Sequence, residues 1–208
     1  MTEILLVRHG QTRANATGYW EGWSDSPLNT TGQAEAEAIA GRLAAERGQI
    51  AALYTSPLRR ALQTAHAIGR RLALSPKVLN QLKEIHFGKL EGTTLRQMED
   101  RFPELYAQWQ DRTDMTFRWP EGERREDFFA RAAAACQSIC ARHDGDKVVI
   151  VTHGGTIRAC LAHFLPELLG QWWDYSLDNA GLTRVWTSGD DARLISLNDT
   201  DHLPKRRA

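Results

Sequence analysis

Two short apolar runs, far apart in the sequence, both end in a histidine followed by glycine. Residues 4–7 are Ile-Leu-Leu-Val and lead into Arg8 and His9, while residues 148–151 are Val-Val-Ile-Val and lead through a threonine into His153. Runs this short and this rich in branched side chains indicate buried strands. Because ligands of open α/β sheets bind beyond the carboxyl ends of the strands, we expect both histidines at one edge of a sheet.

A third basic element is expected at the same edge. Residues 51–55 have the pattern of a strand, Pro57 marks the start of a helix, and the first turn of that helix carries Arg59 and Arg60. Gly155 is expected to open another helix after the second histidine strand. The edge therefore combines imidazoles, arginines and a helix N-terminus, which together suit an anionic ligand.

Strands and helices alternate along the chain, which predicts the α/β class, here as a three-layer α/β/α sandwich with a mostly parallel central sheet. The other elements are a loop at 13–28, helices at 31–47 (capped by Thr30), 125–143 and 156–164, and strands at 77–79, 182–187 and 193–197. A segment at about residues 85–122 is too long for a simple connection and is expected to be an inserted, lid-like segment with helices at 93–101 and 103–112. No linker divides the chain, so one domain is expected over residues 1–208.

The charge balance argues against a polyanionic partner. Lys plus Arg and Asp plus Glu each number 26, so the formal net charge is zero, and neither nucleic acid nor a membrane is the expected partner. No apolar stretch approaches the roughly 18 residues of a membrane span and no secretory pattern precedes the first strand, so a cytoplasmic location is expected. Cys136, Cys140 and Cys160 fit small buried side chains, not a disulfide framework.

Five motifs occur in an order that is typical of one enzyme family. They are Leu6-Val7-Arg8-His9-Gly10-Gln11-Thr12 with Asn15; Gly22-Trp23-Ser24-Asp25-Ser26-Pro27-Leu28 followed by Gly32; Ser56-Pro57-Leu58-Arg59-Arg60-Ala61 with Gln63-Thr64-Ala65; Glu84-Ile85-His86-Phe87-Gly88 with Glu91-Gly92; and Thr152-His153-Gly154-Gly155. With these motifs, the sequence resembles the phosphoglycerate mutase-like branch of the histidine phosphatase superfamily, from residue 4 to about residue 200.

The resemblance implies how the charged residues are used. His9 is implied as the nucleophile that carries a phosphohistidine, and Arg8 and Arg60 as the guanidinium groups that hold the phosphoryl oxygens. His153 is implied as an electrostatic partner that is most useful when protonated. Glu84 is implied as the acid that protonates the leaving oxygen and then activates water.

Phosphate and substrate contacts are expected from five further residues. They are Asn15, Glu21, Gly22, Gly154 and Trp20. No cofactor is implied, and a metal site is not expected because His9 and His153 lack a third ligand at a matching spacing. The expected partner is a small-molecule phosphate ester, and the chain is expected to act as a monomer or a homodimer.

The implied activity is that of a metal-independent phosphomonoesterase that hydrolyses a small phosphorylated metabolite. Two alternatives stay open, a cofactor-dependent phosphoglycerate mutase and a phosphate-ester-binding regulatory protein without catalysis. Mutases of the family carry a longer insertion after the Glu84 motif, with an adjacent pair of arginines, whereas Arg96, Arg101 and Arg112 stand singly here. Hydrolysis is therefore favoured over mutase chemistry.

Several residues bear on the substrate. Trp20, Trp23, Trp109 and Trp119 are expected either to wall a pocket for a bulky, apolar group or to pack the lid-like segment on the domain. Glu21 stands where relatives commonly have Gln or Thr, and its carboxylate is expected to repel a second anionic group.

Two further arginines directly follow motif residues in the sequence or lie one helical turn beyond them. Arg124 stands where the family usually has Ser, directly after Glu123, and it either adds positive charge near the pocket or points away. Glu123 is expected to orient residues around the site. Arg158, one turn into the helix after His153, is expected to be a structural ion-pair partner.

Overall fold

The computed structural model describes residues 1–171, 173–189 and 191–204. At its centre lies a six-stranded sheet in the order β3-β2-β4-β1-β5-β6. The strands are β1 (Thr2–Arg8), β2 (Ile50–Thr55), β3 (Lys77–Val78), β4 (Lys147–Thr152), β5 (Leu182–Ser188) and β6 (Asp191–Asp199). β1 to β4 are parallel to one another, whereas β5 pairs antiparallel with β1 and β6 pairs antiparallel with β5. This confirms the predicted mostly parallel sheet.

The two histidine strands lie side by side at the centre of the sheet. β1 and β4 pair in parallel, with Val7 opposite Val151 and Arg8 opposite Thr152. The pairing continues one residue past β1, because the backbone N–H of His9 donates to the carbonyl of Thr152 at 2.9 Å. Both strands therefore end at the same edge, as predicted.

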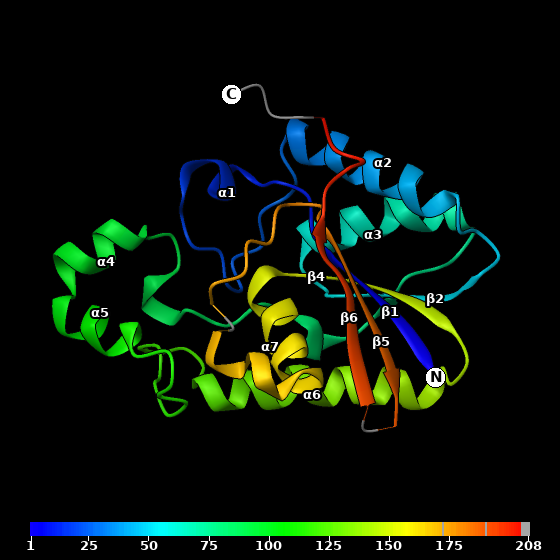
Figure 1. The fold of residues 1–208 in the computed structure, drawn as a ribbon. Helices are drawn as coiled ribbons and strands as arrows, with labels where there is room; N and C mark the ends of the chain where they lie inside the picture. The colour runs from blue at the N-terminus through cyan, green and yellow to red at the C-terminus, as the bar shows by residue number, and fades with distance from the viewer. Residues whose placement is uncertain (172, 190, 205–208) are drawn as a thin grey trace.

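Helices cover both faces of the sheet, so the predicted three-layer sandwich is confirmed (Figure 1). One layer consists of α2 (Thr30–Ala44) and α3 (Arg59–Leu72), and the other contains α6 (Arg125–Arg142) and α7 (Gly154–Phe164). Alternate residues of β1 face the two layers: Leu5 and Val7 belong to the core under α2 and α3, and Ile4 and Leu6 to the core under α6 and α7. A strand buried on both faces needs a continuous apolar run.

The inserted segment (residues 85–122) precedes α6 in the sequence. It contains η2 (Gly88–Leu90), α4 (Leu95–Arg101) and α5 (Pro103–Gln110), and it follows η1 (Asn80–Leu82). In Figure 1, α4 and α5 project beyond the side of the sheet. The helices begin where capping rules place them, α4 at a reciprocal capping box of Thr94 and Gln97 and α5 at a proline in its first position.

Some local structure differs from the sequence-based expectation. The segment predicted as a loop at 13–28 begins with the short helix α1 (Arg13–Thr17), because Thr12 and Asn15 form a capping box. The N-cap of α2 is Asn29, whose side chain accepts from the Gly32 N–H at 2.8 Å, so the predicted cap at Thr30 was wrong by one residue. α7 begins at Gly154, two residues earlier than predicted, and η3 (Pro166–Gln171) follows it.

Two general features of the chain complete the description. In the part that the structure describes, no helix is long and apolar enough to cross a membrane. The cysteines are free thiols. Cys136 and Cys160 are fully buried between α6 and α7, in agreement with the prediction of small buried side chains, whereas Cys140 is only partly buried.

Candidate active site

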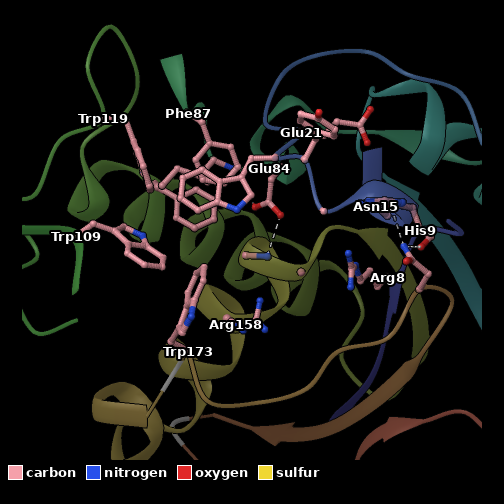
Figure 2. Close-up of a pocket in the computed structure, with 18 of the residues that line it drawn as sticks. Arg8, His9, Asn15, Glu21, Glu84, Phe87, Trp109, Trp119, Arg158 and Trp173 are labelled. Carbon is pink, nitrogen blue, oxygen red and sulfur yellow. Dashed lines mark hydrogen bonds between the residues drawn. The ribbon is translucent and has the colours of Figure 1, made fainter. Parts of the chain in front are cut away.

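A cavity of about 430 Å³ opens beyond the carboxyl ends of β1 and β4, next to the first turn of α7 (Figure 2). Its two ends differ in chemistry. The polar end is lined by Arg8, His9, Asn15, Glu21, Glu84, Gly154 and Arg158, and the aromatic end by Trp20, Phe87, Trp109, Trp119 and Trp173. The polar residues come from the end of β1, from α1, from α7 and from two loops, whereas most of the aromatic residues come from the inserted segment.

His9 is held in one tautomer. Its side chain is 3% exposed, and its Nδ1 lies 2.7 Å from the carbonyl oxygen of Gly10. Because a carbonyl oxygen only accepts, Nδ1 carries the proton in this hydrogen bond and Nε2 keeps its lone pair. Burial, followed by the charges of Arg60 and Arg8, holds the pKa of His9 well below its usual value. The imidazole is therefore neutral and able to act as a nucleophile near pH 7.

His153 lies behind His9 and does not line the cavity. The ring centroids are 5.1 Å apart at an interplanar angle of 60°, and the His153 Nε2 lies 2.8 Å from the Ser56 hydroxyl. Burial, then the positive charge of Arg60, lowers the pKa of His153 well below its usual value. This favours the neutral form of His153 in this structure, and a protonated His153 beside a bound phosphoryl group stays a prediction. A bound dianion would act in the opposite direction and raise the pKa of His153.

Arg8 and Asn15 line the polar end. Arg8 Nη1 donates to the carbonyl of Leu177 at 2.5 Å, while its Nε is buried without a hydrogen-bond partner among the described residues. The side-chain oxygen of Asn15 accepts from the Thr12 backbone N–H and from the Asn179 amide, each at 3.1 Å. The NH₂ group of Asn15 is thus the part that remains for an anion. Gly154 lines the same end as the first residue of α7.

Arg60 is fully buried and does not line the cavity. Its Nη1 donates to the carbonyl of Ser24 at 2.7 Å, and its Nη2 donates to the carbonyls of Gly22 at 2.7 Å and Glu21 at 3.1 Å. The two terminal nitrogens of the guanidinium that was expected to hold a phosphoryl group are thus engaged, whereas its Nε is buried without a hydrogen-bond partner among the described residues. The charge of Arg60 also lowers the pKa of His9, and a direct phosphate contact stays a prediction.

Gly22 also departs from its expected place, since it does not line the cavity. A Cβ atom at this position would lie 2.4 Å from the carbonyl oxygen of Ile85 and 2.6 Å from Glu91 Oε1. The glycine is therefore needed for close packing of two loops, and its own carbonyl accepts a hydrogen bond from Arg60.

Glu84 lines the cavity and is fixed by backbone donors. Its Oε1 accepts from the N–H of Ile85 and its Oε2 from the N–H of Gly155, both at 2.9 Å. Arg131 of α6 holds the same loop, because its guanidinium donates to the carbonyls of Lys83 and Glu84 at 2.7 Å each. The carboxylate is thus presented to the cavity from a rigid loop, as a proton donor or acceptor needs.

Glu123 completes this support. Its two carboxylate oxygens accept from Arg131 Nε at 2.6 Å and Nη2 at 2.7 Å, and Oε2 also accepts from the His86 N–H at 2.8 Å. Arg124, in contrast, is exposed and pairs with Glu126 at 2.7 Å. Of the two alternatives for Arg124, the structure therefore supports the one in which it points away.

Glu21 lines the cavity, and its Oε2 accepts from the Thr12 hydroxyl at 2.5 Å. Its Oε1 has no hydrogen-bond partner among the described residues. The expected acidic group at the edge of the pocket is therefore present (Figure 2).

The aromatic end contains three of the four tryptophans considered in the sequence. Trp20 packs against Trp109 and Trp119 with ring centroids 5.6 and 5.2 Å apart. Trp23 does not line the cavity: it is 40% exposed, and its indole N–H donates to the carbonyl of Glu84 at 2.9 Å. Trp173 was missed, because no local motif marks the segment after α7 as part of the site.

Arg158 was expected to form a structural ion pair, but it lines the cavity. Its Nη2 donates to the carbonyl of Tyr175 at 2.7 Å, and its Nε is buried without a partner among the described residues. The sequence contained an indication of this position: Arg158 follows Gly154 by four residues and so lies on the same face of the helix. Within the described ranges, no group of three or more His, Cys, Asp or Glu side chains is arranged to hold a metal ion.

Burial of two neutral imidazoles predicts an acid-sensitive fold. Because the pKa values of His9 and His153 lie well below the usual 6.5, the unfolded chain binds more protons than the folded chain below that pH. The free energy of unfolding should then fall with falling pH, by up to about 1.4 kcal/mol per pH unit for each imidazole. Urea unfolding between about pH 5 and pH 7.5 measures this slope.

Two variants identify the source of that slope. His153→Gln should reduce the slope of the free energy of unfolding against pH by the contribution of one imidazole. His66→Gln, at an exposed position on α3, should leave the slope unchanged. An unaltered slope in His153→Gln would show that other groups cause the acid sensitivity.

The comparison with known families and structures agrees with this site. The model of the histidine phosphatase superfamily (branch 1) matches residues 4–200. The bifunctional protein Rv2228c of Mycobacterium tuberculosis is 36% identical over 203 residues, which are 97% of this chain and 55% of that relative, so the chain spans about half of its length.

Two further proteins are similar over much of the chain. The metal-independent phosphoserine phosphatase of Arabidopsis thaliana is 39% identical over 163 residues, which are 76% of this chain and 67% of that protein. The solved structure of Bacillus stearothermophilus YhfR superimposes with a TM-score of 0.88 at 32% identity and covers 98% of this chain and 100% of its own. With two histidine strands at the centre of such a fold and a family match over nearly its whole length, this chain belongs to the histidine phosphatase superfamily, branch 1.

Proposed function

We propose that this chain is a metal-independent phosphomonoesterase that works through a phosphohistidine at His9. The observation that carries the proposal is the buried, neutral imidazole of His9, whose Nδ1–H is bound to Gly10 while the ring lines a cavity shared with Arg8 and Glu84. A phosphate monoester needs a nucleophile, positive charge for its oxygens and a proton for the leaving oxygen. These three groups meet those needs.

In the first step, Nε2 of His9 attacks phosphorus and the bond from phosphorus to the ester oxygen breaks. Arg8, the Asn15 amide and the N-terminus of α7 at Gly154 stabilise the phosphoryl oxygens. Protonated Glu84 donates its proton to the departing ester oxygen, which leaves as an alcohol. Arg60 and His153 support His9 from behind, because both are buried next to it.

In the second step, Glu84 acts as a base. Its carboxylate takes a proton from a water molecule, the water oxygen attacks phosphorus, and the bond from phosphorus to Nε2 breaks. Inorganic phosphate leaves, and His9 and protonated Glu84 are restored for the next turnover. Neither step requires a metal ion.

Release of phosphate from 4-nitrophenyl phosphate in the presence of a chelator tests this function. Steady release that chelation does not affect is the expected result. Faster interconversion of 3- and 2-phosphoglycerate than phosphate release would identify a mutase, and tight ester binding without release would identify a regulatory protein. The name of the Arabidopsis relative, a metal-independent phosphoserine phosphatase, supports hydrolysis.

The proposed enzyme acts on a small-molecule phosphate ester. We further propose that it works as one domain in the cytoplasm, as a monomer or a homodimer and without a cofactor. A formal net charge of zero supports a small-molecule partner, because there is no overall field to attract nucleic acid or an anionic membrane.

The aromatic end of the cavity is proposed to hold the body of the substrate. Trp20→Ala should lower kcat/KM for 1-naphthyl phosphate about tenfold, since one lost aromatic contact is worth about 0.5–1.5 kcal/mol in addition to burial. The loss for glycerol phosphate, which has no ring, should be small. The ratio of the two kcat/KM values is the measurement.

Trp186→Ala is the matched control, because Trp186 lies on β5 and does not line the cavity. Should Trp20→Ala reduce kcat/KM for both esters by the same factor, these tryptophans pack the inserted segment and do not select the substrate.

A further inference from the structure

Arg158 occupies a position between the two ends of the cavity. Its Nη1 lies 3.3 Å from where a Cβ atom on Gly154 would stand, and Arg8 Nε lies 3.7 Å from the same point. On its other side, the guanidinium carbon of Arg158 lies 5.1 Å from the ring centroid of Trp173. Figure 2 shows Arg158 between Arg8 and Trp173 accordingly. Arg158 therefore lies next to the phosphoryl end but faces the space that the rest of the substrate must fill.

The charge of Arg158 is incompletely balanced by the protein. Among the described residues Arg158 forms no salt bridge, although the charge of the Glu84 carboxylate acts on it. The carboxylate of Glu84 is already held by two backbone N–H groups, and the hydrogen-bond acceptor of Arg158 is a neutral carbonyl. A half-buried guanidinium of this kind is stabilised by an anionic partner from outside the chain.

The cavity is also asymmetric in charge. Glu21 contributes negative charge beside Thr12, and Arg158 contributes positive charge beside Gly154 on α7. An acidic group of the substrate is thus repelled from the side of Glu21 and attracted to the side of Arg158. The sequence-based expectation that Glu21 excludes a second anion therefore applies to one side of the cavity only.

We propose that Arg158 binds a carboxylate on the leaving group of the substrate and so selects carboxylated phosphate esters. This inference rests on the proposed phosphatase function and adds a specificity-determining residue to it. Carboxylate suits the planar guanidinium fork, because two parallel hydrogen bonds can form. The phosphoryl group itself is bound by Arg8, Asn15 and Gly154, so Arg158 is left for the group attached to the ester oxygen.

The test uses pairs of esters that differ in one carboxylate. One pair is 3-carboxyphenyl phosphate and phenyl phosphate, and the other is O-phosphoserine and O-phosphoethanolamine. Arg158→Met should lower kcat/KM about 10- to 100-fold for the carboxylated member of at least one pair. This is the loss expected when a hydrogen bond to a charged group is removed. The uncarboxylated member should change less than about threefold, and the loss should appear mainly in KM.

Two variants serve as controls. Arg158→Lys retains the charge but loses the fork, so it should recover only part of the discrimination. Arg124→Met removes an exposed arginine outside the cavity and should change neither member of a pair. Circular dichroism and thermal unfolding check that each variant is folded.

Three results would overturn the proposal. An equal loss for both members of each pair, or weaker binding of orthovanadate by Arg158→Met, would assign Arg158 to the phosphoryl site. Unchanged kinetics for all four esters would leave Arg158 without a role in binding. If wild type released phosphate from no ester, the proposed function would fail, and calorimetric binding of the same pairs would still support the carboxylate contact or exclude it.

Discussion

His9→Ala should lower kcat for phosphate release by about 10⁴-fold or more, the size of effect seen when a covalent nucleophile is removed from an enzyme. The reason is that no other imidazole lines the described part of the cavity: His153 lies behind His9, and its Nε2 faces the Ser56 hydroxyl. The variant should still bind phosphate esters, because Arg8 and Asn15 remain. Single-turnover kinetics and calorimetric binding separate these two expectations.

The covalent step can be observed directly. Wild type mixed rapidly with an aryl phosphate and quenched in base should carry an acid-labile phosphoryl group on His9, which peptide mass spectrometry locates. His66→Ala changes an exposed histidine on α3 and should retain both the label and the activity. Full turnover by His9→Ala, or a label on another residue, would refute the mechanism.

Glu84→Gln should lower kcat by about 10²- to 10⁴-fold for an alkyl phosphate, the range that a positioned general acid contributes. The side chain keeps its size, but an amide can neither donate the proton to the leaving oxygen nor accept one from water. With 4-nitrophenyl phosphate, whose leaving group needs little protonation, the first step should remain fast and the second step should be slow. The phosphoenzyme should therefore accumulate.

This difference between substrates is the measurement. A burst of 4-nitrophenol equal to the enzyme concentration, followed by slow turnover, is expected for Glu84→Gln. Glu121→Gln is a suitable control, since Glu121 is exposed and pairs with Lys89 on the surface. Equal losses for the alkyl and aryl esters without a burst would mean that Glu84 acts in binding and not in proton transfer.

The positions of the strands and helices at the polar end of the cavity can be predicted from local sequence. A strand buried on both faces needs an unbroken apolar run, and parallel neighbours end at one edge, so the positions of His9 and His153 could be predicted from residues 4–9 and 148–153 alone. The helix at 59–72 was equally clear, because an apolar face and a proline at its start mark it. These features depend on contacts within a few residues.

The use of each side chain was less predictable, because it depends on contacts between distant segments. Nothing in the sequence around Arg60 indicates that three carbonyls of residues 21–24 occupy its guanidinium. Trp173 lies at the cavity wall where the segment after α7 packs against Trp109 of the inserted segment. The tautomer of His9 similarly required a distance to a carbonyl oxygen.

The attachment of the inserted segment suggests how enzymes of this kind diversify. The segment is held where it leaves the body by the bond from the Trp20 N–H to the Thr93 carbonyl, and where it returns by Arg125, which donates to carbonyls of Trp109, Asp111 and Asp114. The groups that we propose to carry out phosphoryl transfer lie outside these anchors. Residues 94–124 therefore form a natural unit of exchange, and chimaeras joined there would inherit reaction chemistry from one parent and part of the substrate wall from the other.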